Sequence, residues 1–233
     1  MSAPASTPVL ARARLRRDQP AEALARILVP EDPGTRLGAA HSLVWALFAD
    51  GADRRRDFLW REMRPGEFLI LAVRPPTDAH NVFDLEFKPF SPVLRPGQCL
   101  GFDLRANPVI SVPEKPGQRG KRHDVVMNVL SKLARGERAA AREAAIRDAG
   151  TAWLVRKGTA AGFRVDPSRL YIDGYDRVRI PREDTRAVIF STLSFQGVLT
   201  VEDPAQFLAA VLRGFGAAKG FGCGLMLIRR PRL

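Results

Sequence analysis

The sequence predicts an α+β protein built from two similar units. Three observations support this prediction: 45% of the 233 residues are apolar, strand-like and helix-like segments recur in both halves, and a Pro- and Gly-rich loop at 88–98 separates the halves. We place the units at 1–91 and 98–233. In each unit, strands enclose helices, and two ferredoxin-like β-α-β-β-α-β units with antiparallel sheets are the simplest architecture that accommodates them.

The first unit begins with residues 9–17, in which small or apolar residues alternate with Arg, as in a strand with one solvated face. Residues 35–49 carry apolar side chains at helical spacing. After a polar turn at 50–56, the apolar run at 68–73 predicts a buried strand. The alternation of apolar and acidic residues at 83–87 predicts a strand with one solvent-exposed face. The expected order in this unit is therefore β-α-β-β.

The second unit begins with a strand in which Leu100, Phe102 and Leu104 alternate with other residues. A basic loop then leads into a helical stretch from about 124 to 157. Residues 163–180 contain an Asp-Gly pair between two strand-like halves, which predicts a hairpin. The remaining elements are a strand at 187–201, a helix at about 203–213, a Gly-rich loop and a strand at 225–230.

The formal net charge of +12 is concentrated in one part of the chain. Residues 105–233 carry 23 Lys and Arg against 12 Asp and Glu, whereas residues 1–104 carry 14 against 13. An Arg-rich proteome would spread its charge evenly, whereas a surface that binds a polyanion concentrates it. We therefore predict a nucleic-acid-binding surface on the second half.

Several other classes of protein are disfavoured. Cys99 and Cys223 cannot form a disulfide framework, and neither has metal-ligand spacing with His41, His80 or His123. GxSxG and a setting for paired carboxylates are missing from the sequence, and the longest apolar runs fall short of the roughly 20 residues that span a bilayer. We expect a soluble cytoplasmic protein with no metal, no cofactor and no membrane partner.

Two features are candidates for chemistry. His41 lies within an apolar helix; such a residue is more often a packing residue, but RNA cleavage needs a group that titrates near neutrality. Residues 214–224 contain five glycines and one cation, Lys219. This loop lacks GxxxxGK[ST] and follows a helix, so a nucleotide-binding loop is disfavoured. Two interpretations remain: a tight connection with Gly214 as the helix cap, or a loop that lies along an RNA backbone.

Three motifs carry a family resemblance. Residues 195–228 end in the pattern G-h-G-x-x-K-x-x-G-h-G-L, where h is apolar, without a gap. FDLRANP at 102–108 is followed by GKR at 120–122, and AHSLVWALF at 40–48 has the form H-x-x-L/V-W-x-L-F. Together these segments resemble the CasE endoribonucleases, the repeat-processing subunits of type I-E CRISPR effector complexes.

The resemblance implies a tandem ferredoxin-like (RRM-like) fold and a metal-independent endoribonuclease. Such an enzyme binds the stem-loop of a CRISPR repeat and cleaves precursor RNA at the 3′ base of the stem. The RNA 2′-hydroxyl attacks, leaving a 2′,3′-cyclic phosphate, and the protein stays with the guide RNA and other subunits in the effector complex. The resemblance places His41 at the catalytic position.

The predicted RNA-binding residues are the cations and glycines of the motifs together with the arginines of 163–180: Arg36, Arg105, Lys121, Arg122, Lys219, Gly216, Gly222, Gly224, Arg169, Arg177 and Arg179. One departure is Gly38, because many members of the family carry Tyr three residues before the histidine. A non-catalytic subunit that holds guide RNA is therefore the alternative prediction.

Overall fold

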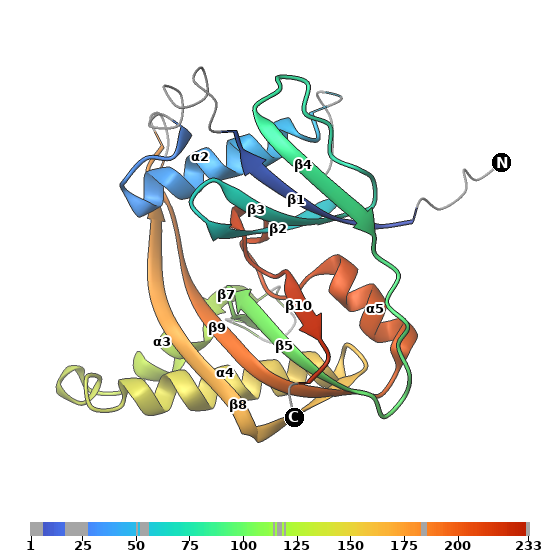
Figure 1. Ribbon diagram of the computed structural model, residues 1–233. Helices are drawn as coiled ribbons and strands as arrows, with labels where there is room; N and C mark the ends of the chain where they lie inside the picture. The colour runs from blue at the N-terminus through green and yellow to red at the C-terminus, as the bar shows by residue number, and fades with distance from the viewer. Residues whose placement is uncertain are drawn as a thin grey trace.

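Two four-stranded antiparallel sheets form the frame of the protein, which confirms the predicted α+β class with tandem ferredoxin-like sheets (Figure 1). The computed structural model describes residues 7–16, 28–49, 51, 56–113, 115, 118, 120–182 and 186–231. Within these ranges, no helix is both long and apolar enough to cross a membrane.

The first sheet has the order β2-β3-β1-β4, with helix α2 against one face. Small residues Ala11 and Ala13 of β1 are completely buried there, which lets the helix approach the sheet. The elements are β1 (Val9–Leu15), α2 (Pro33–Ala46), β2 (Phe58–Arg64), β3 (Glu67–Ala72) and β4 (Phe83–Pro89).

Two details of the first sheet differ from the sequence prediction. Strand β2 was not predicted, and the segment 73–82, where the ferredoxin-like order has its second helix, contains no helix. Pro75 and Pro76 in this segment disfavour a helix, since proline lacks the backbone N–H that a helix interior needs.

The second sheet has the order β10-β5-β9-β8, the complete ferredoxin-like order. Its core contains the fully buried rings of Trp153, Phe163, Phe195 and Phe207. The elements are β5 (Cys99–Ala106), β6 (Val109–Val112), β7 (Lys121–Asp124), α3 (Val125–Leu130), η1 (Arg135–Glu137), α4 (Arg142–Thr159), β8 (Phe163–Ile180), β9 (Val188–Val201), α5 (Pro204–Arg213), η2 (Lys219–Phe221) and β10 (Met226–Arg229).

Two predictions for the second half are wrong. Residues 163–180 form one strand, β8, which pairs with β9 along its length, instead of a hairpin. Gly174, with φ of 61°, lies in an irregularity where two residues of β8 face one of β9, so the Asp-Gly pair forms a bulge and not a turn. The single helical stretch is two helices, α3 and α4, with η1 between them.

The two sheets are joined by packing as well as by the chain. Leu59 of β2 and Leu71 of β3 belong to the core of the second half, and Arg61 forms an ion pair with Asp103 of β5 at 2.5 Å. In Figure 1, the long strands β8 and β9 rise from the second sheet until the end of β8 meets α2.

Candidate active site

His41 lies on α2, with its ring at the contact between the two halves. Asp32 begins this helix, because its carboxylate accepts a hydrogen bond from the Thr35 amide at 2.7 Å. Ala40 and Val44 bury one face of α2 against the first sheet. The His41 ring lies beside this face and contacts the turn η2 of the second half.

A single carbonyl group fixes the state of the His41 ring. His41 Nδ1 lies 2.7 Å from Gly220 O, and Trp60 Nε1 donates to the same oxygen at 3.0 Å. A carbonyl oxygen can only accept, so Nδ1 carries a hydrogen and Nε2 remains for chemistry. Trp60 is completely buried, and this bond satisfies its indole N–H.

Aromatic rings hold the imidazole from two sides. Phe221 lies with its ring centroid 4.8 Å from that of His41, and Trp45 meets the imidazole edge-on at 5.9 Å. Phe190 of β9 stacks on Phe221 at 5.9 Å. His41 therefore has a defined orientation that depends on both halves of the chain.

The Gly-rich loop is attached to strand β5 and to Asn107, the residue directly after it. The Ala217 amide donates to Asn107 O at 3.0 Å, and the Gly224 amide donates to Arg105 O at 2.7 Å. A Cβ on Gly216 would lie 2.6 Å from Asn107 O, and one on Gly222 would lie 3.2 Å from the Trp60 ring.

Close packing within the protein therefore accounts for these glycines, and direct RNA contact by Gly216, Gly222 and Gly224 stays a prediction. Gly214 ends α5 with φ of 77°, as the helix-cap interpretation expected.

A cleft of about 440 Å³ lies between the two halves, and its wall includes Phe221, whose ring contacts that of His41. Phe221 and Gly222 form part of its wall, and Leu37, one turn before His41 on α2, forms another part. Five of the sequence-predicted residues line this cleft: Gly222 and the cations Arg36, Arg105, Arg177 and Arg179.

Two carboxylates moderate the positive charge of the cleft. Arg36 Nε lies 3.9 Å from a Glu62 oxygen, and an Arg105 nitrogen lies 3.9 Å from Asp176. Burial raises the pKa of Glu62, against the opposing effect of Arg36.

Cys223 also lines the cleft, but it is not positioned to act as a nucleophile. Burial raises the pKa of its thiol to about 12, so it stays protonated. Among the residues that the structure describes, no group of three or more His, Cys, Asp or Glu side chains could hold a metal ion.

The other predicted cations lie outside this cleft. Lys219 is in η2, directly before Gly220, and Arg122 is on β7, where it borders a second cavity of about 280 Å³ together with Gly216. Lys121 is exposed on the same strand, and Arg169 is exposed on β8 away from both cavities. The sequence prediction omitted Trp60, because it lies in the strand that was not predicted.

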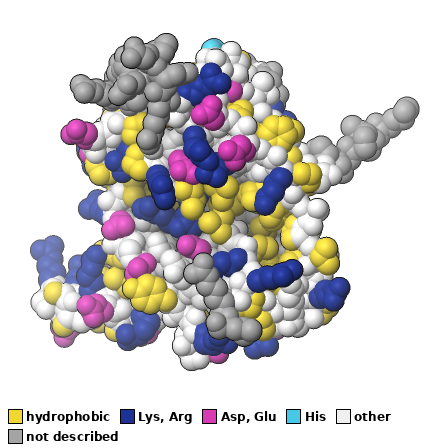
Figure 2. Space-filling model, viewed as in Figure 1, with side chains coloured by type: hydrophobic (Ala, Val, Ile, Leu, Met, Phe, Trp, Pro, Cys, Tyr) yellow, Lys and Arg dark blue, Asp and Glu magenta, His cyan; other side chains and the backbone are white. Residues whose placement is uncertain are grey.

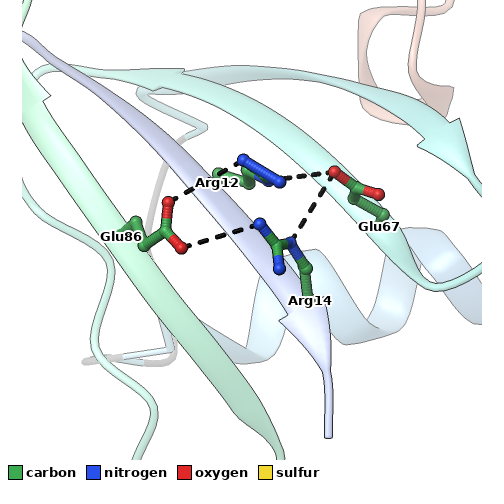
Figure 3. Close-up of polar contacts among 4 residues, drawn as sticks. All are labelled: Arg12, Arg14, Glu67 and Glu86. Carbon is green, nitrogen blue, oxygen red and sulfur yellow. Dashed lines mark hydrogen bonds and ion pairs between the residues drawn. The ribbon is translucent and has the colours of Figure 1, made fainter.

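Arginines of the first sheet are balanced by carboxylates. Arg12 and Arg14 of β1 each lie between Glu67 of β3 and Glu86 of β4, at nitrogen to oxygen distances of 2.9 to 3.9 Å (Figure 3). Figure 2 shows the resulting mixture of basic and acidic side chains over the upper part of the molecule. The near-neutral charge of the first half thus reflects local pairing.

Two glycines bring α2 against the end of β8. A Cβ on Gly34 would lie 2.1 Å from Arg179 O, and one on Gly38 would lie 3.3 Å from the Ile180 Cγ2 methyl. Ile180 therefore lies against the face of α2 that carries Gly38. This contact joins the helix of His41 to the strand of Arg177 and Arg179.

Two ferredoxin-like sheets with an arginine-lined cleft and an oriented histidine between them define a protein of the tandem ferredoxin-like class. The sequence pattern described as CRISPR associated protein matches residues 10–230. The chain therefore belongs to the CasE family of CRISPR-associated proteins, which confirms the resemblance seen in the sequence.

Individual relatives extend this comparison. The chain is 29% identical over 211 residues to the Cascade subunit CasE of Escherichia coli (strain K12), which covers 87% of this chain and 96% of that protein. It is 31% identical over 150 residues, 60% of each chain, to the CRISPR-associated endoribonuclease Cse3 of Thermus thermophilus. A structure of Cse3 bound to a 19-nucleotide RNA shares the fold, with a TM-score of 0.68, 24% identity, and coverage of 97% of this chain and 100% of that chain.

Proposed function

We propose that this chain is a metal-independent endoribonuclease that processes precursor CRISPR RNA. It binds the stem-loop of the repeat, cleaves at the 3′ base of the stem and remains with the guide RNA as a subunit of the type I-E complex. Family membership supports this proposal, since the relatives are named as a CRISPR endoribonuclease and as a subunit of the Cascade complex.

The orientation of His41 is the observation that carries the proposal. With Nδ1–H bound to Gly220 O, Nε2 is the nitrogen that exchanges a proton with RNA. The 2′-oxygen attacks the adjacent phosphorus, the bond from phosphorus to the 5′-oxygen breaks, and a 2′,3′-cyclic phosphate forms. The reaction removes one proton from the 2′-hydroxyl and adds one to the departing 5′-oxygen. Neutral His41 can accept the first proton at Nε2, whereas protonated His41 can donate the second from Nε2.

The cleft supplies the positive charge that a phosphate backbone requires. Arg36, Arg105, Arg177 and Arg179 line it, and arginine can bind phosphate through two parallel N–H bonds. Arg169 and Lys121 extend the proposed RNA surface along the second half. We also keep units 1–91 and 98–233 as proposed domains, since the first sheet ends with β4 at Pro89 and the second begins with β5 at Cys99.

His41→Ala tests the proposal, with His80→Ala as control because His80 lies in an exposed loop. In EDTA, wild-type protein and the control should cleave a CRISPR repeat RNA, whereas His41→Ala should cleave about 10²- to 10⁴-fold more slowly and still bind it. A 2′-deoxy substitution at the scissile nucleotide should block cleavage by every variant. Unchanged cleavage by His41→Ala contradicts the assignment, and loss of wild-type cleavage in EDTA that returns with Mg²⁺ contradicts metal independence.

The alternative, a non-catalytic subunit that holds guide RNA, is favoured by Gly38 in place of the family Tyr. In that case the wild-type protein would bind the unmodified repeat tightly and leave it intact, as it leaves the 2′-deoxy repeat. Cleavage of the unmodified repeat alone excludes this alternative.

A further inference from the structure

Four cations from four separate elements lie around the Gly-rich loop. Arg122 comes from β7, Lys157 from the last turn of α4, Arg213 from the last turn of α5 and Lys219 from η2. Among the residues that the structure describes, none of the four forms an ion pair. They therefore differ from the paired arginines of the first sheet.

The crowding of these charges affects Lys219 directly. Partial burial lowers the pKa of its ammonium group, and the neighbouring cations Arg56, Arg213, Lys157 and Arg122 lower it further. Like charges held together without a partner are unfavourable, and a bound anion removes that cost.

The space beside Arg122 and Lys157 is open enough for such an anion. A cavity of about 280 Å³ is lined by Arg122 and Lys157, by Ser111 of β6, and by the loop residues Gly216 and Ala217. The Ala217 amide attaches the loop to Asn107, directly after β5, so this wall of the cavity is fixed.

The preference for cations near the C-terminal end of a helix explains only part of this arrangement. Cations are favoured in the last turn of a helix, which applies to Lys157 and Arg213 separately. It does not apply to Arg122, which is on a strand, or to Lys219, which is in a short turn. Arg122 and Lys157 line one cavity, and Arg213, Lys157 and Arg122 are close enough to Lys219 to act on its charge. This arrangement indicates a shared anionic ligand.

We propose that Arg122, Lys157, Arg213 and Lys219 form a phosphate-binding site for the RNA backbone next to the cleavage position. This inference rests on the proposed function and adds Lys157 and Arg213 to the RNA-binding residues. Lys219 directly precedes Gly220, whose carbonyl holds His41, so a strand bound here passes beside the imidazole.

The first test measures the salt dependence of RNA binding. Binding of the 2′-deoxy repeat is titrated against KCl for Lys157→Ala, Arg213→Ala and, as control, Arg164→Ala. Arg164 is exposed, lies in the same half and pairs with Glu202. Each phosphate contact removed should make the slope of log K against log salt less steep by about 0.7 to 0.9, with no change for the control. Wild-type slopes in both test variants overturn the inference.

The second test uses lysine acylation, read by mass spectrometry on the wild-type protein. Bound repeat RNA should protect Lys157 and Lys219 and leave Lys132, an exposed lysine after α3, unprotected. Equal protection by the same concentration of inorganic phosphate indicates an isolated ion site and overturns the backbone assignment.

The two tests separate this inference from the proposed function. Cleavage of the repeat without protection of Lys157 and Lys219 overturns the phosphate site and leaves the endoribonuclease proposal intact. Protection by a generic uridine oligonucleotide, combined with no binding of the repeat, supports the site and contradicts repeat processing.

Discussion

Gly34→Ala tests how much the contact between α2 and β8, as distinct from either element alone, contributes to cleavage. The added Cβ would lie 2.1 Å from the backbone oxygen of Arg179, and real Cβ contacts are essentially never shorter than 3.0 Å. The helix and the strand must therefore move apart by at least about 0.9 Å. Because backbone meets backbone, a rotamer change cannot relieve the clash.

The expected effect on cleavage follows from what the two elements carry. Helix α2 holds His41 and Arg36, and β8 holds Arg177 and Arg179, which line the same cleft as Arg36. A displacement of about 1 Å between catalytic and binding groups costs on the order of 10²-fold in rate. The same clash should reduce the free energy of unfolding by about 1 to 3 kcal/mol.

Single-turnover cleavage at saturating protein, well below the melting temperature, distinguishes the two effects. Gly34→Ala should lower the maximal rate more than it weakens RNA binding. Gly136→Ala is the matched control, since an added Cβ there meets nothing within 4 Å. Gly38→Ala, with a mild 3.3 Å contact and about 1 kcal/mol of gained helix propensity, should change either property little. A wild-type maximal rate for Gly34→Ala would refute the reasoning.

Two further predictions concern side chains near the cleft. Trp60→Phe removes one of the two hydrogen-bond donors to the Gly220 carbonyl that holds His41. Cleavage should slow by up to about tenfold with unchanged RNA affinity. An unchanged cleavage rate would show that the single donor from His41 suffices. Glu62→Gln should stabilise the protein in thermal melts at neutral pH. Burial raises the pKa of Glu62 in the folded state. This side chain therefore contributes to the stability of the wild-type protein below its pKa in the unfolded state, and that contribution is lost as pH rises through its pKa in the folded state. The advantage of the variant should therefore shrink towards pH 4, and an advantage independent of pH contradicts this cause.

Local sequence patterns predicted the elements that bury one face and expose the other. Helix α2 and the segment α5, Gly-rich loop and β10 were predicted close to their observed bounds, because each buries one face and caps its helix with a short polar residue. Strand β2 was missed because its first three residues are all buried: Phe58 and Trp60 face α2, whereas Leu59 faces the core of the second half. A strand covered on both sides loses the alternation that marks a strand.

The error at 163–180 has a related cause. An Asp-Gly pair favours both a two-residue turn and a bulge, and only pairing with β9 decides between them. Leu170 and Ile172 pack against the core of the second half, and this burial keeps β8 continuous through the bulge.

Composition, short-range periodicity and motifs within single segments were enough to predict the fold class, the excess of positive charge in the second half and the candidate histidine. The contacts of His41 required the folded chain, because Gly220 lies 179 residues away along the sequence and Trp60 is 160 residues from Gly220. The orientation of the imidazole, the arginine-lined cleft and the second group of cations all require side chains from both halves or from several elements. No periodicity within one segment encodes such contacts, since they form only when the two sheets pack together.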